Sequence, residues 1–98
     1  MKNIEILAIG THPEIMKTIL RLLNSKAGWH GTLSFSAEEA ISNIDKAAID
    51  IVLVCAGLSI EETKLIQANF SVPVVQHYGG GSGLIYAEVC EALKIALP

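Results

Sequence analysis

Three residues could do chemistry together at one edge of a sheet: His12, Cys55 and His77. Each lies at or just beyond the end of a short apolar run, and the carboxyl ends of parallel strands meet at one edge, where α/β proteins bind ligands. A thiol and two imidazoles could serve as soft metal ligands. A closed zinc site needs four ligands, however, and the chain has no Cys-x-x-Cys or comparable spacing. We therefore expect no metal site, and we expect His12 to be a helix-start residue and His77 a partly exposed one.

Cys55 supports two interpretations. It could be a redox-active or phosphoryl-accepting thiol at the end of a strand, which would require a lowered pKa. It also closes the apolar run 51–55, where a cysteine commonly acts as a small hydrophobic residue. The second interpretation predicts no catalytic residue, and mass spectrometry after treatment with phosphodonors or an alkylating agent would separate the two.

A glycine-rich run follows the last strand-like segment and could hold an anion. It comprises Gly79, Gly80, Gly81, Ser82 and Gly83. Exposed backbone amides at a helix start can bind phosphate or carboxylate. The run lacks the G-x-G-x-x-G spacing, because Leu84 stands where the third glycine would be, and it has no P-loop lysine. A turn into the last helix is the simpler interpretation, and the anion site remains an alternative.

The elements that would position these residues alternate along the chain. Three near-continuous apolar runs, at 4–9, 51–55 and 72–75, are typical of strands buried on both faces of a parallel sheet. The run 32–36 alternates and predicts an edge strand. Three four-residue patterns, beginning at Thr11, Ser36 and Ser59, resemble capping boxes at the starts of helices. A fourth helix is predicted from about Ser82 and is apolar almost all round.

This order predicts one α/β domain over residues 1–98. Parallel strands joined by helices require right-handed crossovers. We expect a flavodoxin-like three-layer α/β/α fold with a four-stranded parallel sheet in the order 2-1-3-4.

Four segments resemble response-regulator receiver domains. They are residues 6–15 (ILAIGTHPEI), 36–40 (SAEEA), 50–55 (DIVLVC) and 72–78 (VPVVQHY). In receivers, the first of these strands runs into two adjacent acids, the third ends in the phosphoacceptor aspartate and the fourth ends in Ser or Thr. The resemblance implies the same fold and a role in signal transduction.

The departures from the receiver pattern fall on the active positions. Gly10 and Thr11 stand at the acid pair that holds Mg²⁺, Cys55 at the phosphoacceptor, and Tyr78 at the Ser/Thr switch. The fifth strand with its lysine has no counterpart. Glycine and threonine cannot replace the carboxylates that Mg²⁺ prefers. We expect no aspartyl phosphorylation and no cofactor.

The cellobiose-type B subunits of the phosphotransferase system offer a second comparison. They are also four-stranded, are similar in size and accept phosphate on a cysteine. That cysteine ends their first strand, where this chain has Gly10 and Thr11.

Composition excludes several classes of function. The seven basic residues are scattered and the net charge is −3, so we expect no nucleic-acid binding. No apolar run approaches the about 20 residues of a membrane helix, and the first residues do not form a signal peptide. Two cysteines without pairing motifs predict reduced thiols in a cytoplasmic protein.

These observations lead to two functional hypotheses. The first is a non-enzymatic pseudo-receiver that acts as a signalling or scaffold module through protein–protein contact, as a homodimer or with a larger partner. The last helix and the edge of the fourth strand would form its contact surface. The alternative is a small-molecule or anion-binding domain that uses the strand-end cleft and the glycine loop 79–83.

Overall fold

The computed structural model describes residues 3–77 and 82–94. Its strands are β1 (Ile4–Ile9), β2 (Trp29–Ser34), β3 (Ile51–Val54) and β4 (Val74–Gln76). Its helices are α1 (Pro13–Ser25), α2 (Ala37–Asn43), α3 (Ile60–Asn69) and α4 (Ser82–Leu93), with a short 3₁₀ turn at Lys46–Ala48.

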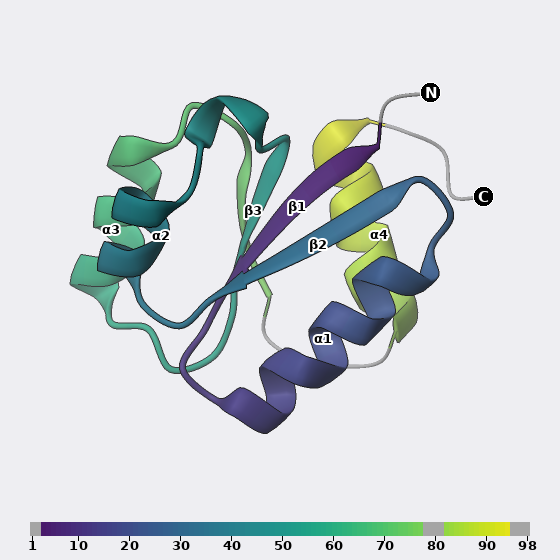
Figure 1. Ribbon diagram of the computed structural model, residues 1–98, viewed down its shortest axis with the longest axis horizontal. Coiled ribbons are helices and arrows are strands. Elements are labelled where there is room, and N and C mark those ends of the chain that lie inside the picture. The colour runs from purple at the N-terminus through teal and green to yellow at the C-terminus, as the bar shows by residue number, and fades with distance from the viewer. Residues whose placement is uncertain (1–2, 78–81, 95–98) are drawn as a thin grey trace.

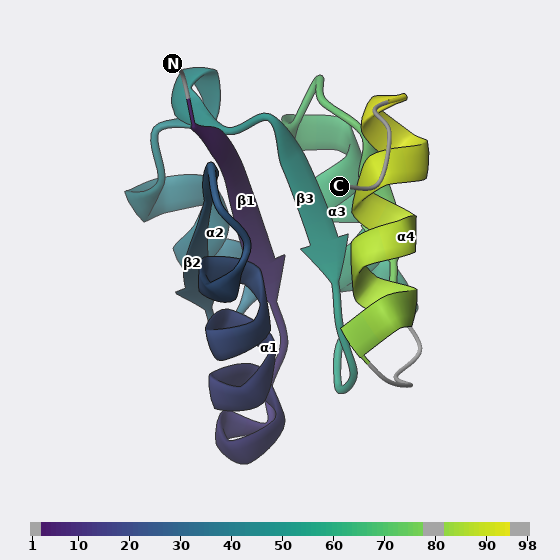
Figure 2. The same ribbon diagram turned by 90° about the vertical axis from the view of Figure 1, so that its right-hand side faces the viewer.

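The four strands form one parallel sheet in the order β2-β1-β3-β4, as the sequence predicts. Helices α1 and α4 cover one face and α2 and α3 the other, which gives three layers (Figures 1 and 2). Strands β1 and β3 lie in the centre and are almost entirely buried, which explains why their sequences do not alternate.

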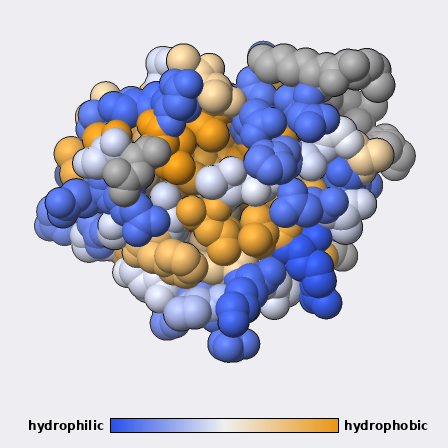
Figure 3. Space-filling view, viewed as in Figure 1, coloured by the Kyte–Doolittle hydropathy of each residue, from blue (hydrophilic) through white to orange (hydrophobic). Residues whose placement is uncertain are grey.

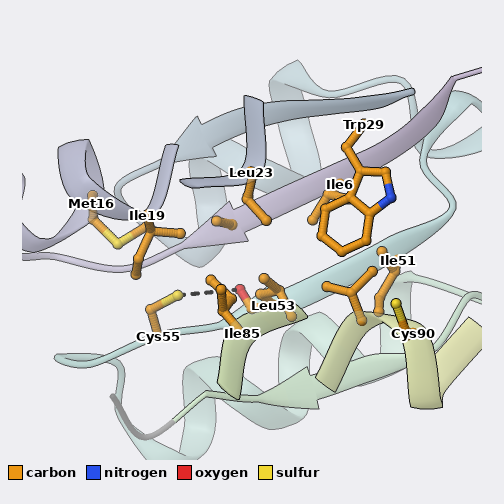
Figure 4. Close-up of a cluster of buried hydrophobic side chains, with 12 residues drawn as sticks. Ile6, Met16, Ile19, Leu23, Trp29, Ile51, Leu53, Cys55, Ile85 and Cys90 are labelled. Carbon is orange, nitrogen blue, oxygen red and sulfur yellow. Dashed lines mark hydrogen bonds between the residues drawn. The ribbon is translucent and has the colours of Figure 1, made fainter. Parts of the chain in front are cut away.

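Each face of the sheet has its own hydrophobic core, because successive strand side chains point to opposite faces. Ile6, Ala8, Ile51 and Leu53 join the core beneath α1 and α4 (Figure 4). A second set packs against α2 and α3, and its strand members are Leu7, Ile9, Val52 and Val54. The two cores therefore fix the positions of the carboxyl ends of β1 and β3, where the candidate site residues lie.

Strand β2 begins at Trp29, three residues before the predicted start, and ends at Ser34. Residues 29–31, which the sequence did not predict as strand, are held by a contact between Trp29 and a residue distant in sequence. The Trp29 ring is buried and meets Tyr86 of α4 edge-on, with ring centroids 5.7 Å apart. Tyr86 also donates to the carbonyl of Leu22 (3.2 Å) and hydrogen-bonds the Ser25 hydroxyl (2.9 Å), so it joins α4 to the end of α1.

Of the three predicted capping boxes, the one at Ser59 is complete, the one at Ser36 forms only in half, and the one at Thr11 was wrong. Ser59 and Glu62 make a complete capping box at α3, and Ser36 accepts from the amide of Glu39 (3.0 Å) at α2. Helix α1 is instead preceded by His12, which makes no side-chain cap. The residue before a proline is driven into extended backbone, and Pro13 therefore places the helix boundary at His12 rather than Thr11.

Candidate functional site

The carboxyl ends of the strands form a rim that main-chain hydrogen bonds hold together. The amide of Gly10 donates to Ser34 (3.1 Å) and that of Thr11 donates to Ala56 (3.2 Å). The amide of His77 donates to the carbonyl of Val54 (2.8 Å). As the sequence predicts, the ends of β1, β3 and β4 thus lie side by side.

Gly10 occupies a space that side chains already fill. It is buried, and a Cβ built on it would lie 2.6 Å from the sulfur of Met16 and 3.0 Å from the Cβ of Cys55. The first distance is shorter than any that real Cβ atoms show, and the second lies at the limit. An acidic side chain at this position would need Met16 and Cys55 to move.

The loop after β3 is packed equally closely against the loop after β1. Gly57 has a φ of +97°, which favours glycine, and a Cβ there would lie 1.7 Å from the hydroxyl oxygen of Thr11. The Thr11 side chain therefore occupies the space that a side chain on residue 57 would need.

Cys55 is a buried thiol with its Sγ 3.9 Å from the carbonyl oxygen of Leu53 (Figure 4). Only 3% of the residue is exposed. Burial, followed by the nearby Glu88 carboxylate, raises the pKa of Cys55 to about 12. The thiol is therefore protonated at neutral pH and is a poor nucleophile.

His77 lies at this rim in an ion-pair geometry that the sequence did not predict. Its Nδ1 hydrogen-bonds the Glu88 carboxylate of α4. His77 is 6% exposed, so the expectation of a partly exposed residue was wrong. The signal in the sequence was Glu88, a carboxylate between the buried Ile85 and Val89 of a largely apolar helix. Glu88 thus bonds to His77 and also contributes to the raised pKa of Cys55.

His12 does not join that cluster. Its side chain is exposed at the start of α1. Across residues 3–77 and 82–94, no group of three His, Cys, Asp or Glu side chains is arranged to hold a metal ion.

Several predicted positions fall outside the described residues. They are Tyr78, Gly79, Gly80 and Gly81. Ser82 and Gly83 form the first turn of α4, as the predicted helix start requires. The anion-binding interpretation of the loop therefore stays a prediction.

Hydrophobic side chains surround the rim instead. In the described part of the chain, the exposed large hydrophobic residues are Ile15, Phe35, Ile60, Leu65 and Leu84. All except Leu65 lie in the first turn of a helix or directly after a strand, and hence at the strand-end edge. Elsewhere, hydrophobic residues also gather over β2 and between α1 and α2 (Figure 3).

No family model and no curated protein sequence matches the chain. Among solved structures, the chain is similar to one described as the trimeric coiled coil of yeast Spc42 fused to another protein structure. The TM-score is 0.75 at 18% identity, and the match covers 96% of this chain and 81% of that one. At this identity, the similarity shows the fold alone. Within the described ranges, no helix is long and apolar enough to cross a membrane.

Proposed function

We propose that the protein is a pseudo-receiver: a signalling or scaffold module that works through protein–protein contact and is not phosphorylated on an aspartate. The observation that carries the proposal is the packing at Gly10. The position that matches a receiver's first acid has no carboxylate, and the space beside it is filled by Met16 and Cys55.

The phosphoacceptor position supports the same proposal. Cys55 is buried, and its raised pKa keeps the thiol protonated. A transferring phosphoryl group needs positive charge to stabilise its transition state, and in receivers that charge comes from Mg²⁺ and a lysine. Neither the acid pair nor the lysine-bearing strand is part of this sequence.

The exposed hydrophobic side chains favour a contact function. Ile15, Phe35, Ile60 and Leu84 lie around the edge where an active receiver would have its acidic site. Single exposed hydrophobic residues are ordinary, but several at one edge mark an interaction surface. The low share of charged residues, 17%, agrees with a surface that a partner covers in part.

A two-part experiment tests the proposal. The protein is incubated with acetyl phosphate and Mg²⁺, and its intact mass is measured beside that of an active receiver. We expect no phosphoryl adduct on this chain. A phosphoryl adduct mapped to the strand-end rim would overturn the proposal.

The second part measures contact. The immobilised protein is exposed to an extract of its native cell, and its self-association is followed by sedimentation. We expect a retained protein or a dimer, unaffected by acetyl phosphate, and weakened by Phe35→Ser or Ile60→Ser. Leu65→Ser is the matched control, because Leu65 is also a large, exposed hydrophobic residue but lies in the body of α3. A monomer that retains nothing would contradict the proposal.

A further inference from the structure

The outer edge of β4 has hydrogen-bonding groups that the sheet does not use. In the parallel ladder, Pro73 and His77 bond to β3 through the pairs Val52 N–Pro73 O and His77 N–Val54 O. Successive residues of a strand point their backbone groups to opposite sides. The N–H and C=O groups of Val74 and Gln76 therefore face outward, and no strand in the described part of the chain pairs with them.

A hollow lies beside this edge on the α4 face of the sheet. It has a volume of about 290 Å³ and is lined by Val75, Glu88, Glu91 and Ala92. Val75 and Ala92 are aliphatic, and the acidic groups come from α4, where Glu91 is exposed and Glu88 already bonds to His77. This combination suits a lysine or arginine, whose stem packs on aliphatic groups while its charge meets carboxylates.

A second hollow lies beside the same edge on the α3 face. It has a volume of about 250 Å³ and is lined by Leu58, Ile60, Thr63, Lys64, Gln67 and Gln76. Leu58 and Ile60 provide an apolar part, and Ile60 is one of the exposed hydrophobic residues of the strand-end edge. This hollow suits an aliphatic side chain and, because of Lys64, disfavours a basic one.

We propose that β4 is the docking edge for an extended segment of a partner protein that alternates basic and aliphatic residues. An added strand bonds to Val74 and Gln76, and its side chains point alternately to the two faces of the sheet. Basic residues then enter the hollow with Glu88 and Glu91, and aliphatic residues enter the hollow with Leu58 and Ile60. The docking edge rests on the proposed contact function and specifies the chemistry of the partner.

A second copy of this chain fits the edge less well. Two β4 strands paired antiparallel about a two-fold axis would place α4 beside α4, with the Glu88 and Glu91 carboxylates of both copies together. Like charges so close are unfavourable. Moreover, Val74–Gln76 contains no basic residue to enter the acidic hollow.

The test uses short, acetylated and amidated peptides of alternating lysine and valine, with alternating glutamate and valine as the comparison. Binding is followed by two-dimensional NMR of the full chain. We expect the lysine peptide to bind saturably, to shift the amides of Val74 and Gln76, and to slow their hydrogen exchange. The glutamate peptide should bind at least about tenfold more weakly, because it places carboxylates opposite Glu91.

Two variants locate the contact. Glu91→Gln should weaken binding of the lysine peptide about threefold or more, as expected for an exposed charge pair, whereas Glu39→Gln on α2 should not. Gln76→Pro removes an outward N–H without removing a bond to β3, and it should abolish the shifts at the edge. Thermal unfolding checks that Gln76→Pro folds. If it does not fold, the effect of Glu91→Gln on binding of the lysine peptide still tests the proposal.

The proposal is overturned if the lysine peptide does not shift the β4 amides, or if the two peptides bind equally. It is also overturned if Glu91→Gln changes nothing, or if the edge amides shift with protein concentration alone, which would indicate a second copy. These failures leave the pseudo-receiver proposal intact, since that proposal fails on a phosphoryl adduct or on the absence of any partner.

Discussion

At the scale of single residues, the rim is defined by which side chains fill it. Gly10, Met16 and Cys55 pack so closely that a side chain introduced at position 10 requires these neighbours to shift. The part of the rim around Gly10 is thus a continuation of the hydrophobic core.

Gly10→Asp should destabilise the fold by about 2 kcal/mol or more, because it overfills the core and buries a charge. Thr11→Asp is the matched control, since Thr11 is exposed and its substitution should change the free energy of unfolding by less than about 1 kcal/mol. Urea unfolding measures both. Equal stability of Gly10→Asp and the parent would show that the space beside Gly10 is open.

The Cys55 thiol should make stability fall at high pH. Its pKa is about 12 in the folded chain against 9.0 for an unperturbed thiol, so above pH 9 the unfolded state loses this proton first. The free energy of unfolding should therefore decrease by up to about 1.4 kcal/mol per pH unit between pH 9 and 12, and this contribution is fully present below pH 9.

Urea unfolding at several pH values, compared with Cys55→Ala, isolates the contribution of this thiol from that of every other group in the chain. Cys55→Ala should have the shallower pH dependence. Identical slopes in the two proteins would contradict a buried, protonated Cys55. Slow alkylation of the native thiol at neutral pH is the corresponding chemical observation.

At the scale of elements, the ends of the helices are fixed by local chemistry of unequal strength. The box at α3 has two bonds, from the Glu62 amide to the Ser59 hydroxyl (3.1 Å) and from the Ser59 amide to the Glu62 carboxylate (3.3 Å). At α2, one such bond is present, to Ser36. The start of α1 relies on the backbone of Pro13 and His12.

Ser59→Ala should cost about 1 kcal/mol of stability, because an orphan amide of α3 loses its acceptor. Ser71→Ala, in the exposed loop before β4, should have almost no effect. Chemical denaturation measures the difference. A loss no greater at Ser59 than at Ser71 would mean that water replaces the cap at no cost.

These elements also show what the sequence could predict. The apolar runs of β1 and β3 and the caps at Ser36 and Ser59 are local patterns, and they predicted the alternation of strands and helices. The sheet order followed from the general rules for such alternating α/β folds. The start of β2 at Trp29 and the pairing of His77 with Glu88 depend on α4, which is distant in sequence from Trp29. A pattern read along one segment carries no information about such partners, and the burial of His77 was therefore missed.

At the scale of the whole molecule, the sheet has a protected centre and two edges. Backbone amides of β1 and β3 should exchange with solvent most slowly, because both strands are paired on each side and buried by helices. Amides of β2 and especially of the three-residue β4 should exchange faster. Hydrogen exchange read by NMR checks this order, and protection of β4 equal to that of β3 would contradict an open edge.

The contact between Trp29 and Tyr86 gives the molecule an optical reporter. The chain has one tryptophan, and its indole lies against the last helix rather than in the middle of the sheet. Intrinsic fluorescence should therefore follow the docking of α4 more directly than the integrity of the strands. If α4 detaches before the sheet unfolds, the emission will change at a lower denaturant concentration than the circular dichroism. The same signal would report a partner that displaces α4, without any added label.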